Sequence, residues 1–334
     1  MKKYMPYIIF GALIIFLIVG AVILKANQKQ KVFTRNLLYM DTYINIKVYT
    51  DNKEIEKKFE EIDKIYKEYH ELTDRYNGYD DLINVHNINN NKLEIEFLTI
   101  DERLYDILEY SLEWKEKSKG LFNIEIGNVI DAWKQYFELS NGIPSLEELE
   151  EASLNVKDIK LLPDNKILNN NPNIDLGAIA KGYVTGIVGN YLEENGFDKY
   201  IINAGGQVVV GNKYRESLYK IGIRNPINSS ENIAVVNGEN ISVATSGGYE
   251  RFYEYEGTKY NHIINPKTLY PSNYMISVTV VSNDSKLNDI LTTTLFLMSI
   301  EEGLEFVNQR EGVEAIWFTN DHQIIKSKGF NVYE

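Results

Sequence analysis

An uncharged apolar run near the N-terminus places the strongest limit on how this chain can fold. No residue from Tyr4 to Leu24 is charged, and the core of the run reads YIIFGALIIFLIVGAVIL. A helix needs roughly 20 apolar residues to cross a bilayer. A cleaved signal peptide is the alternative, but its apolar region is normally shorter, and no A-x-A-like cleavage site precedes Lys25. We therefore expect an uncleaved transmembrane anchor with a short polar linker over residues 1–31, and one folded domain over residues 32–334.

The charges that flank this run do not decide its orientation. Lysines precede it at positions 2 and 3, and basic residues follow it at Lys25, Lys29, Lys31 and Arg35. Because cytoplasmic flanks usually carry the excess of Lys and Arg, this pattern leaves the side of the membrane open.

Composition excludes several classes of function. The chain has 35 Lys and Arg against 48 Asp and Glu, a net charge of -13, and no basic run that would suit nucleic acid. It has no cysteine, which excludes thiol nucleophiles, disulfides, zinc–thiolate sites and iron–sulfur sites. The acidity is compatible with a bound metal cation. Only four residues are natural bases near neutral pH: His70, His86, His262 and His322.

The pattern after the anchor mixes helices and strands. Apolar spacing of three and four predicts helices over 55–72, 99–120, 178–196 and 286–298, with Asp51 as cap of the first and a Thr99–Glu102 capping box in the second. Strands are predicted at 43–49, 200–204, 207–211, 218–224, 233–236, 239–245, 276–282 and 313–318. Asn237-Gly238 predicts a hairpin between two of these strands. Because the order is neither repeated βαβ nor all β, we expect an α+β fold with mixed or antiparallel sheets and packed helices.

Three glycine-containing or polar segments are candidate ligand sites. The segment 173–183, NIDLGAIAKGY, opens a helix with a carboxylate, a glycine turn and Lys181, which suits an anion, although such turns are usually only turns. Gly205-Gly206 interrupts a strand and marks either a bulge or a close approach to a ligand. The segment 242–271 contains His262, which is either structural or a base, with hydroxyls and basic residues near it in sequence.

The helix pattern at 286–298 supplies a candidate metal site. One face is apolar, and Asp289 and Thr293 fall four residues apart on the other face. Their carboxylate and hydroxyl oxygens are the hard ligands that Mg²⁺ or Ca²⁺ prefers. A hydrogen-bonded solvent face is the alternative.

Taken in order, these segments resemble the FAD:protein FMN transferase family, also called the ApbE family. The resemblance rests on seven segments: Met40-Asp41-Thr42, Gly120-Leu121-Phe122-Asn123 with Gly127, Asp175–Tyr183, Asn203–Gln207, Ser242–Gly247, His262–Leu269 and Asn288–Thr294. It covers nearly the whole chain after the anchor. Four positions differ from the usual family pattern: Asp41, Gly186 and Leu269 where members often have Gly, Asp and Gly, and Gln207 where they have Asp or Asn.

The resemblance implies a specific reaction. Members of this family use a divalent metal, usually Mg²⁺, to cleave FAD and pass FMN to a Thr or Ser hydroxyl of a target flavoprotein, with release of AMP. By this resemblance FAD contacts are expected at Met40, Tyr76, Leu121, Phe122, Asn123, Asp175, Lys181 and His262. Metal ligands are expected from the side chains of Asp289 and Thr293 and from main-chain oxygens near Ala178 and Thr292. His262 is expected as the base and Asp289 as the catalytic carboxylate.

The resemblance also implies a setting and leaves alternatives. The catalytic domain is expected on the outer face of the cytoplasmic membrane, acting on an acceptor with a D-x-x-[ST]-G-A-[ST]-like motif. The first alternative is an FAD pyrophosphatase, in which water replaces the acceptor hydroxyl. The others are a non-catalytic flavin-binding protein on the membrane and a purely structural anchored domain.

Overall fold

The structure is a computed structural model and describes residues 30–139 and 141–333. The apolar run from Tyr4 to Leu24 and most of the polar linker lie outside these residues. Among the described helices, none is both long enough and apolar enough to cross a membrane.

The fold is built on a central antiparallel sheet. Eight strands lie in the order β1-β2-β6-β7-β10-β13-β14-β15, and each neighbouring pair in the described residues runs antiparallel. Their bounds are Val32–Tyr39, Thr42–Tyr49, Tyr200–Ala204, Gln207–Val210, Ile241–Gly247, Ser277–Ser282, Glu314–Phe318 and Ile324–Lys326. The α+β prediction is confirmed, and the sheets are antiparallel rather than mixed.

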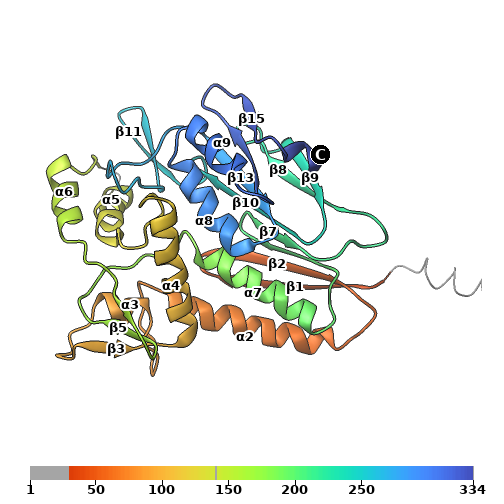
Figure 1. Ribbon diagram of the computed structural model, residues 1–334, viewed down its shortest axis with the longest axis horizontal. Coiled ribbons are helices and arrows are strands. Elements are labelled where there is room, and N and C mark those ends of the chain that lie inside the picture. The colour runs from red at the N-terminus through yellow and green to blue at the C-terminus, as the bar shows by residue number, and fades with distance from the viewer. Residues whose placement is uncertain (1–29, 140, 334) are drawn as a thin grey trace, which may run out of the picture.

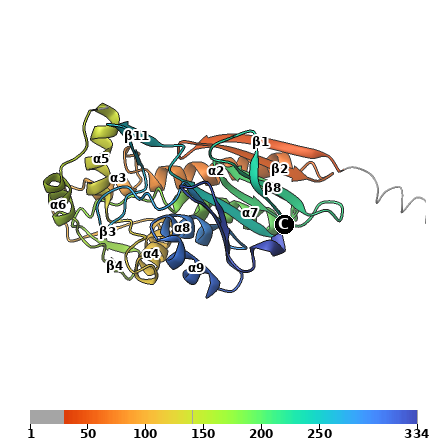
Figure 2. The ribbon, with the colours of Figure 1, turned by 90° about the horizontal axis from the view of Figure 1, so that it is seen from above.

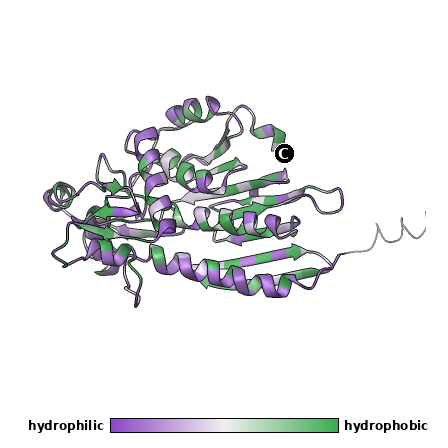
Figure 3. Ribbon diagram, turned by 60° about the horizontal axis from the view of Figure 1, so that its bottom comes forward, coloured by the Kyte–Doolittle hydropathy of each residue, from purple (hydrophilic) through white to green (hydrophobic). Residues whose placement is uncertain are grey.

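Helices cover one face of this sheet. Three of them, α2 (Ile55–Thr73), α7 (Ala180–Glu194) and α8 (Ser285–Phe296), run side by side across it, with α9 (Ile300–Asn308) beyond and α4 (Glu102–Lys117) across one end (Figures 1 and 2). Apolar and polar residues alternate along the helices (Figure 3). In α2 the apolar positions 55, 59, 62, 66, 69 and 72 are all buried, as their spacing predicted. The four helices expected from the sequence are α2, α4, α7 and α8.

A separate hairpin covers part of the other face. It consists of β8 (Tyr219–Arg224) and β9 (Asn232–Gly238), whose inward side chains pack on β7, β10, β13 and β14 in a second apolar cluster. The predicted hairpin at Asn237-Gly238 is therefore wrong. The strand β9 pairs with β8, whereas β10 pairs with β7 and β13, so the chain changes sheets at this turn.

Two smaller units flank the sheet at one end. One contains α5 (Gly127–Leu139), α6 (Leu146–Leu154) and the hairpin of β11 (Phe252–Tyr255) and β12 (Thr258–Asn261). The other contains α3 (Val85–Asn89) and the small sheet of β3 (Phe97–Thr99), β5 (Lys166–Leu168) and β4 (Leu161–Leu162). A short 3₁₀ helix, η1 (Phe330–Tyr333), ends the described chain. The apolar spacing over 127–154 predicted no helix, yet α5 and α6 lie there.

Two predicted helix caps are corrected by the structure. The cap of α4 is Asp101, whose carboxylate accepts the N–H of Arg103, rather than Thr99. Asp51 does not cap α2: the cap position is Glu54, and the Asp51 carboxylate accepts the N–H of Lys31 instead.

Candidate active site

Two tight turns bring the first and fourth motif segments together. Met40 and Asp41 form the two-residue turn between β1 and β2, and their φ angles are 53° and 52°. Gly205 and Gly206 form the turn between β6 and β7, also with positive φ. A Cβ on Gly205 would lie 2.5 Å from Cγ2 of Thr42, so the two turns touch. A methionine in this left-handed conformation is unusual, because such turns favour Asn or Gly. Strain of this kind is common at ligand sites.

The segments around Asn123 and Asp175 also meet. The N–H of Asp175 donates to the carbonyl of Ile124 at 2.8 Å, while the Asn123 side chain accepts the N–H of Glu125 at 2.9 Å. Leu121 is half-buried, but the Phe122 side chain is 1 % exposed and belongs to the main core. Any contact of Phe122 with a ligand would therefore use its main chain.

His262 has the properties of a base. Its Nδ1 lies 3.2 Å from the carbonyl oxygen of Arg251. Because a carbonyl only accepts, Nδ1 holds the proton and Nε2 keeps its lone pair. His262 is exposed to solvent, yet the protein around the ring desolvates it and lowers its pKa below the usual histidine value. The positive charges of Arg251 and Lys181 lower this pKa further.

Three successive threonines on α8 have different roles. Thr292 donates its hydroxyl to the carbonyl of Asp289, and Thr294 donates to the carbonyl of Ile290. Thr293 is half-buried, and its hydroxyl has no hydrogen-bond partner among the described residues. Back-bonding to the previous turn is the usual arrangement for a helical threonine. The Thr293 oxygen therefore stays available for a ligand.

Asp289 lies at the contact between α7 and α8. Its Oδ2 accepts the N–H of Gly182 at 2.8 Å, and no protein donor in the described chain reaches Oδ1. The expected position on an open helix face is corrected: Asp289 is only 9 % exposed, because the glycine lets α7 approach closely. A Cβ on Gly182 would lie 2.5 Å from Cβ of Asp289.

A buried polar network supports this contact. Ser285 on α8 donates to the carbonyl of Gly182 at 2.7 Å, and Gln207 on β7 donates to the hydroxyls of Ser285 and Ser242, each at 2.8 Å. Gln207 Oε1 is buried without a partner. Gly186 also faces Ser285, at a Cβ distance of 3.3 Å. Two of the positions that differ from the family pattern, Gly186 and Gln207, thus meet at the same serine.

The oxygens on α8 fit a hard divalent cation. Oδ1 of Asp289 and the Thr293 hydroxyl are the free side-chain oxygens at i and i+4, and carbonyls near Ala178 and Thr292 are the expected main-chain ligands. Ala178 is half-buried just before α7. Across residues 30–139 and 141–333, no group of three or more His, Asp or Glu side chains gathers into a metal site. A cation here would therefore need substrate or water oxygens to complete its shell.

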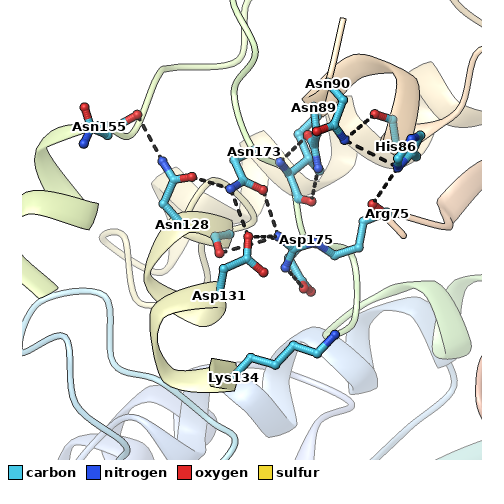
Figure 4. Close-up of polar contacts among 12 residues, drawn as sticks. Arg75, His86, Asn89, Asn90, Asn128, Asp131, Lys134, Asn155, Asn173 and Asp175 are labelled. Carbon is cyan, nitrogen blue, oxygen red and sulfur yellow. Dashed lines mark hydrogen bonds and ion pairs between the residues drawn. The ribbon is translucent and has the colours of Figure 1, made fainter. Parts of the chain in front are cut away.

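Sequence reasoning missed Arg75, which links Tyr76 to Asp175. Arg75 donates from Nη1 to Oδ2 of Asp175 at 2.7 Å (Figure 4). Tyr76, the next residue, is 53 % exposed, and Nζ of Lys134 lies 3.9 Å from the centre of its ring. The only signal in the sequence was a single arginine in the acidic stretch TDRYNGYDD.

Leu269 is another position that differs from the family pattern, in which members often have glycine. The backbone at this position needs a positive φ, which glycine adopts without strain. Its φ is 65°, and its carbonyl accepts the indole N–H of Trp133 on α5 at 2.8 Å. The leucine side chain is buried in a third apolar cluster with Trp133. Burial of the side chain offsets the left-handed strain, so the loop after His262 keeps its shape.

Most predicted site residues lie on turns and helix ends, and the Thr292 hydroxyl donates to the carbonyl of Asp289 within α8. No hydrogen bond joins His262 to Asp289 or Thr293 within the described residues. Two surface hollows, of about 340 and 560 Å³, contain none of the predicted site residues; one lies between α5 and α6, and the other beside Asp51 and Lys213.

Comparisons with known proteins agree with this architecture. The crystal structure of the ApbE protein from Thermotoga maritima superposes with a TM-score of 0.81 and 25% sequence identity, covering 91% of this chain and 99% of that one. The family model described as "ApbE family" matches residues 40–317. This chain therefore belongs to the ApbE family.

Curated relatives named as FAD:protein FMN transferases match a similar part of the chain. The FAD:protein FMN transferase of Klebsiella pneumoniae (strain 342) is 30% identical over 239 residues, which are 69% of this chain and 73% of that protein. The FAD:protein FMN transferase of Treponema pallidum (strain Nichols) is 30% identical over 253 residues, 70% of each chain.

Proposed function

We propose that this protein is a membrane-anchored, metal-dependent FAD:protein FMN transferase. Family membership and the curated relatives make it an enzyme, a flavinyltransferase. The proposed reaction moves FMN from FAD to a Thr or Ser hydroxyl of an acceptor flavoprotein as a phosphoester and releases AMP. The acceptor has a D-x-x-[ST]-G-A-[ST]-like motif.

The pair of free oxygens on α8 carries the metal-dependent part of the proposal. Thr292 and Thr294 use their hydroxyls within the helix, whereas Thr293 and Oδ1 of Asp289 have no protein partner in the described residues. Hard oxygens without donors, on buried Asp289 and half-buried Thr293, suit a divalent cation better than a solvent face. A bound Mg²⁺ would neutralise charge on the pyrophosphate as the phosphoryl group is transferred.

His262 is proposed as the general base. Its Nε2 lone pair would take the proton of the acceptor hydroxyl. The hydroxyl oxygen then forms a bond to the phosphorus of the FMN part, and the bond between that phosphorus and the AMP phosphate oxygen breaks. The lowered pKa keeps the ring neutral, and so able to accept a proton, at neutral pH.

The remaining predicted residues would hold FAD. Exposed Tyr76 offers a flat face to a ring of the dinucleotide, and Lys181 at the start of α7 adds positive charge near the phosphates. The other proposed contacts are Met40, Leu121, the main chain of Phe122, Asn123, Asp175 and His262.

We also propose the setting. The uncharged run from Tyr4 to Leu24 is long enough for a single-pass anchor, residues 32–334 form the catalytic domain, and this domain works on the extracytoplasmic face of the cytoplasmic membrane. The support is the length and composition of the run together with the resemblance to the family.

One assay tests the reaction. The full chain in detergent is mixed with FAD, Mg²⁺ and an acceptor domain that contains the motif. Mass spectrometry should show an FMN phosphoester on the acceptor and AMP in solution, both lost when EDTA is added. FMN and AMP in solution without an adduct would instead establish the FAD pyrophosphatase. FAD bound and unchanged would establish a flavin-binding protein, and no binding would leave a structural domain.

A further inference from the structure

Arg75 is the most extensively bonded charged residue near the proposed FAD site. It follows the end of α2, and its side chain is 7 % exposed. Nη1 donates to Oδ2 of Asp175 at 2.7 Å, and Nη2 donates to Oδ2 of Asp131 and Oδ1 of Asn173, both at 2.8 Å (Figure 4). One guanidinium therefore joins three parts of the chain: the α2–α3 connection, α5 and the loop before α7.

These bonds show what Arg75 does not do. Both of its terminal nitrogens already donate to protein oxygens, and the group is almost fully buried. An arginine that binds a phosphate presents this same pair of nitrogens to the ligand. Arg75 thus acts on other protein residues rather than directly on the dinucleotide.

The group formed by Arg75, Asp131 and Asp175 contains more negative than positive charge. Arg75 is paired with two carboxylates, Asp131 and Asp175. Burial alone would lower the pKa of Arg75, but the charges of Asp175 and Asp131 outweigh it and raise the pKa. Without the guanidinium, these two carboxylates would lose the cation paired with them beside a site that must accept an anionic pyrophosphate, and their field would oppose binding.

The same bonds fix the geometry of two proposed FAD contacts. Asp175 is held at both oxygens, because Oδ1 accepts the N–H of Gly177 at 2.8 Å. The backbone of Tyr76 is held by its N–H bond to Asp74 at 2.7 Å. Arg75 lies between Tyr76 and Asp175, so it sets the distance between a ring-binding residue and a polar one.

We propose that Arg75 is a positioning residue of the FAD site, which holds Asp175 against Tyr76 and balances the charges of Asp131 and Asp175 without touching FAD. The inference rests on the proposed function, since FAD is the ligand it concerns. A positioning role and direct phosphate binding by Arg75 predict different results for one double variant. If Arg75 works by balancing charge, removing a neighbouring carboxylate must compensate for its loss.

The test measures FAD binding by the full chain in detergent, with EDTA present so that no metal or turnover contributes. Tryptophan fluorescence and equilibrium dialysis give Kd for wild type, Arg75→Met and the double variant Arg75→Met/Asp131→Asn. We expect Arg75→Met to raise Kd by about tenfold, equivalent to about 1.4 kcal/mol. The double variant should recover most of this loss, and the loss should shrink at high salt.

The matched control is Arg103→Met. Arg103 also donates to two carboxylates, Asp101 and Glu68, but none of these three is a proposed site residue. This variant should keep the wild-type Kd. An unchanged Kd in folded Arg75→Met, or a double variant no better than the single one, would overturn the inference while leaving the transferase proposal intact. A wild-type chain that binds no FAD would overturn both.

A second variant guards against a simple failure to fold. Circular dichroism and thermal unfolding are recorded for every protein, and Arg75→Lys replaces Arg75→Met should the latter be unfolded. Lysine keeps one positive charge but not the fork of donors. The Kd of Arg75→Lys should lie between the wild-type Kd and a value about tenfold higher, and adding Asp131→Asn should lower it again. A wild-type Kd, or no recovery in the double variant, would contradict the inference.

Discussion

At the scale of single residues, the site is defined by which polar atoms the protein leaves unpaired. Thr292, Thr293 and Thr294 are identical in type and adjacent in sequence, yet only the middle hydroxyl lacks a partner within the described chain. Sequence spacing selected Asp289 and Thr293 because they are four apart. It did not show that the neighbouring hydroxyls are occupied, because that depends on rotamers that the folded helix selects.

The threonines provide a matched pair of variants. Thr293→Val should weaken binding of Mn²⁺, a spectroscopic substitute for Mg²⁺, by at least the roughly 10–100-fold that loss of an outer-shell partner costs. Thr294→Val removes the same group one position away, so it should cost only about 1 kcal/mol of folding free energy. Electron paramagnetic resonance measures the free Mn²⁺, and urea unfolding measures stability. Equal Mn²⁺ affinity in both variants would contradict the metal assignment.

The protonation of His262 gives a prediction with a definite sign. Desolvation and the charges of Arg251 and Lys181 lower its pKa. The ring therefore stays neutral, and able to act as a base, down to a lower pH than an ordinary histidine does. Lys181→Met removes one of these charges and should raise the pKa. The acid limb of the pH–rate profile should move to higher pH.

Proton NMR of the FAD-free protein checks this pKa directly. The chain has four histidines, so a His262→Asn variant identifies the His262 resonance by its loss. An unchanged titration midpoint in Lys181→Met would contradict the effect of the Lys181 charge on His262.

At the scale of elements, periodicity predicted α2, α4, α7, α8 and most central strands, but it did not predict how they pair. The turn at Asn237-Gly238 has the sequence of a hairpin, and yet β9 pairs with β8. The pairing depends on where the apolar faces of β9 and β10 can be buried, which the turn sequence does not determine. The helices α5 and α6 went unassigned, although α5 provides Asp131, which pairs with Arg75, and Lys134, which lies over the Tyr76 ring.

Close packing of α7 on α8 sets the position of Asp289. Gly182→Ala would place a Cβ 2.5 Å from Cβ of Asp289 and 2.6 Å from the Ser285 carbonyl, neither of which can move easily. We expect it to destabilise the fold by about 1–3 kcal/mol and to weaken Mn²⁺ binding.

Gly186→Ala is the control on the same helix. Its nearest contact would be Cβ of Ser285 at 3.3 Å, and alanine gains about 1 kcal/mol of helix propensity over glycine. Its stability and Mn²⁺ affinity should stay near wild type. Thermal unfolding and Mn²⁺ titration compare the two variants, and equal behaviour would contradict the role of the Gly182 contact.

At the scale of the whole molecule, the order of motifs predicted more than any one motif did. Each glycine turn or histidine had an ordinary structural explanation, but seven segments in family order placed the chain in a family that the model match over residues 40–317 confirms. The α+β fold class could be predicted because the spacing of apolar residues is typical of helices in some segments and of strands in others. The network around Arg75 could not, because Arg75 lies 56 to 100 residues in sequence from its partners Asp131, Asn173 and Asp175.

The boundary between anchor and enzyme is the feature of the whole chain that an experiment can test most simply. The apolar core extends from Leu37 to Phe330, and the first sheet strand begins at Val32, so a chain starting at residue 32 retains these elements. We expect this truncated chain to unfold in one thermal transition at the same temperature as the full chain in detergent.

Membrane fractionation then tests the anchor. The full chain should stay in the membrane pellet after alkaline carbonate washing, while the chain from residue 32 should remain in the supernatant, because about 20 apolar residues provide the membrane affinity. External protease should degrade the catalytic domain in intact spheroplasts if it lies on the outer face. A protected domain would reverse the proposed orientation, and a full chain released by carbonate would rule out the anchor.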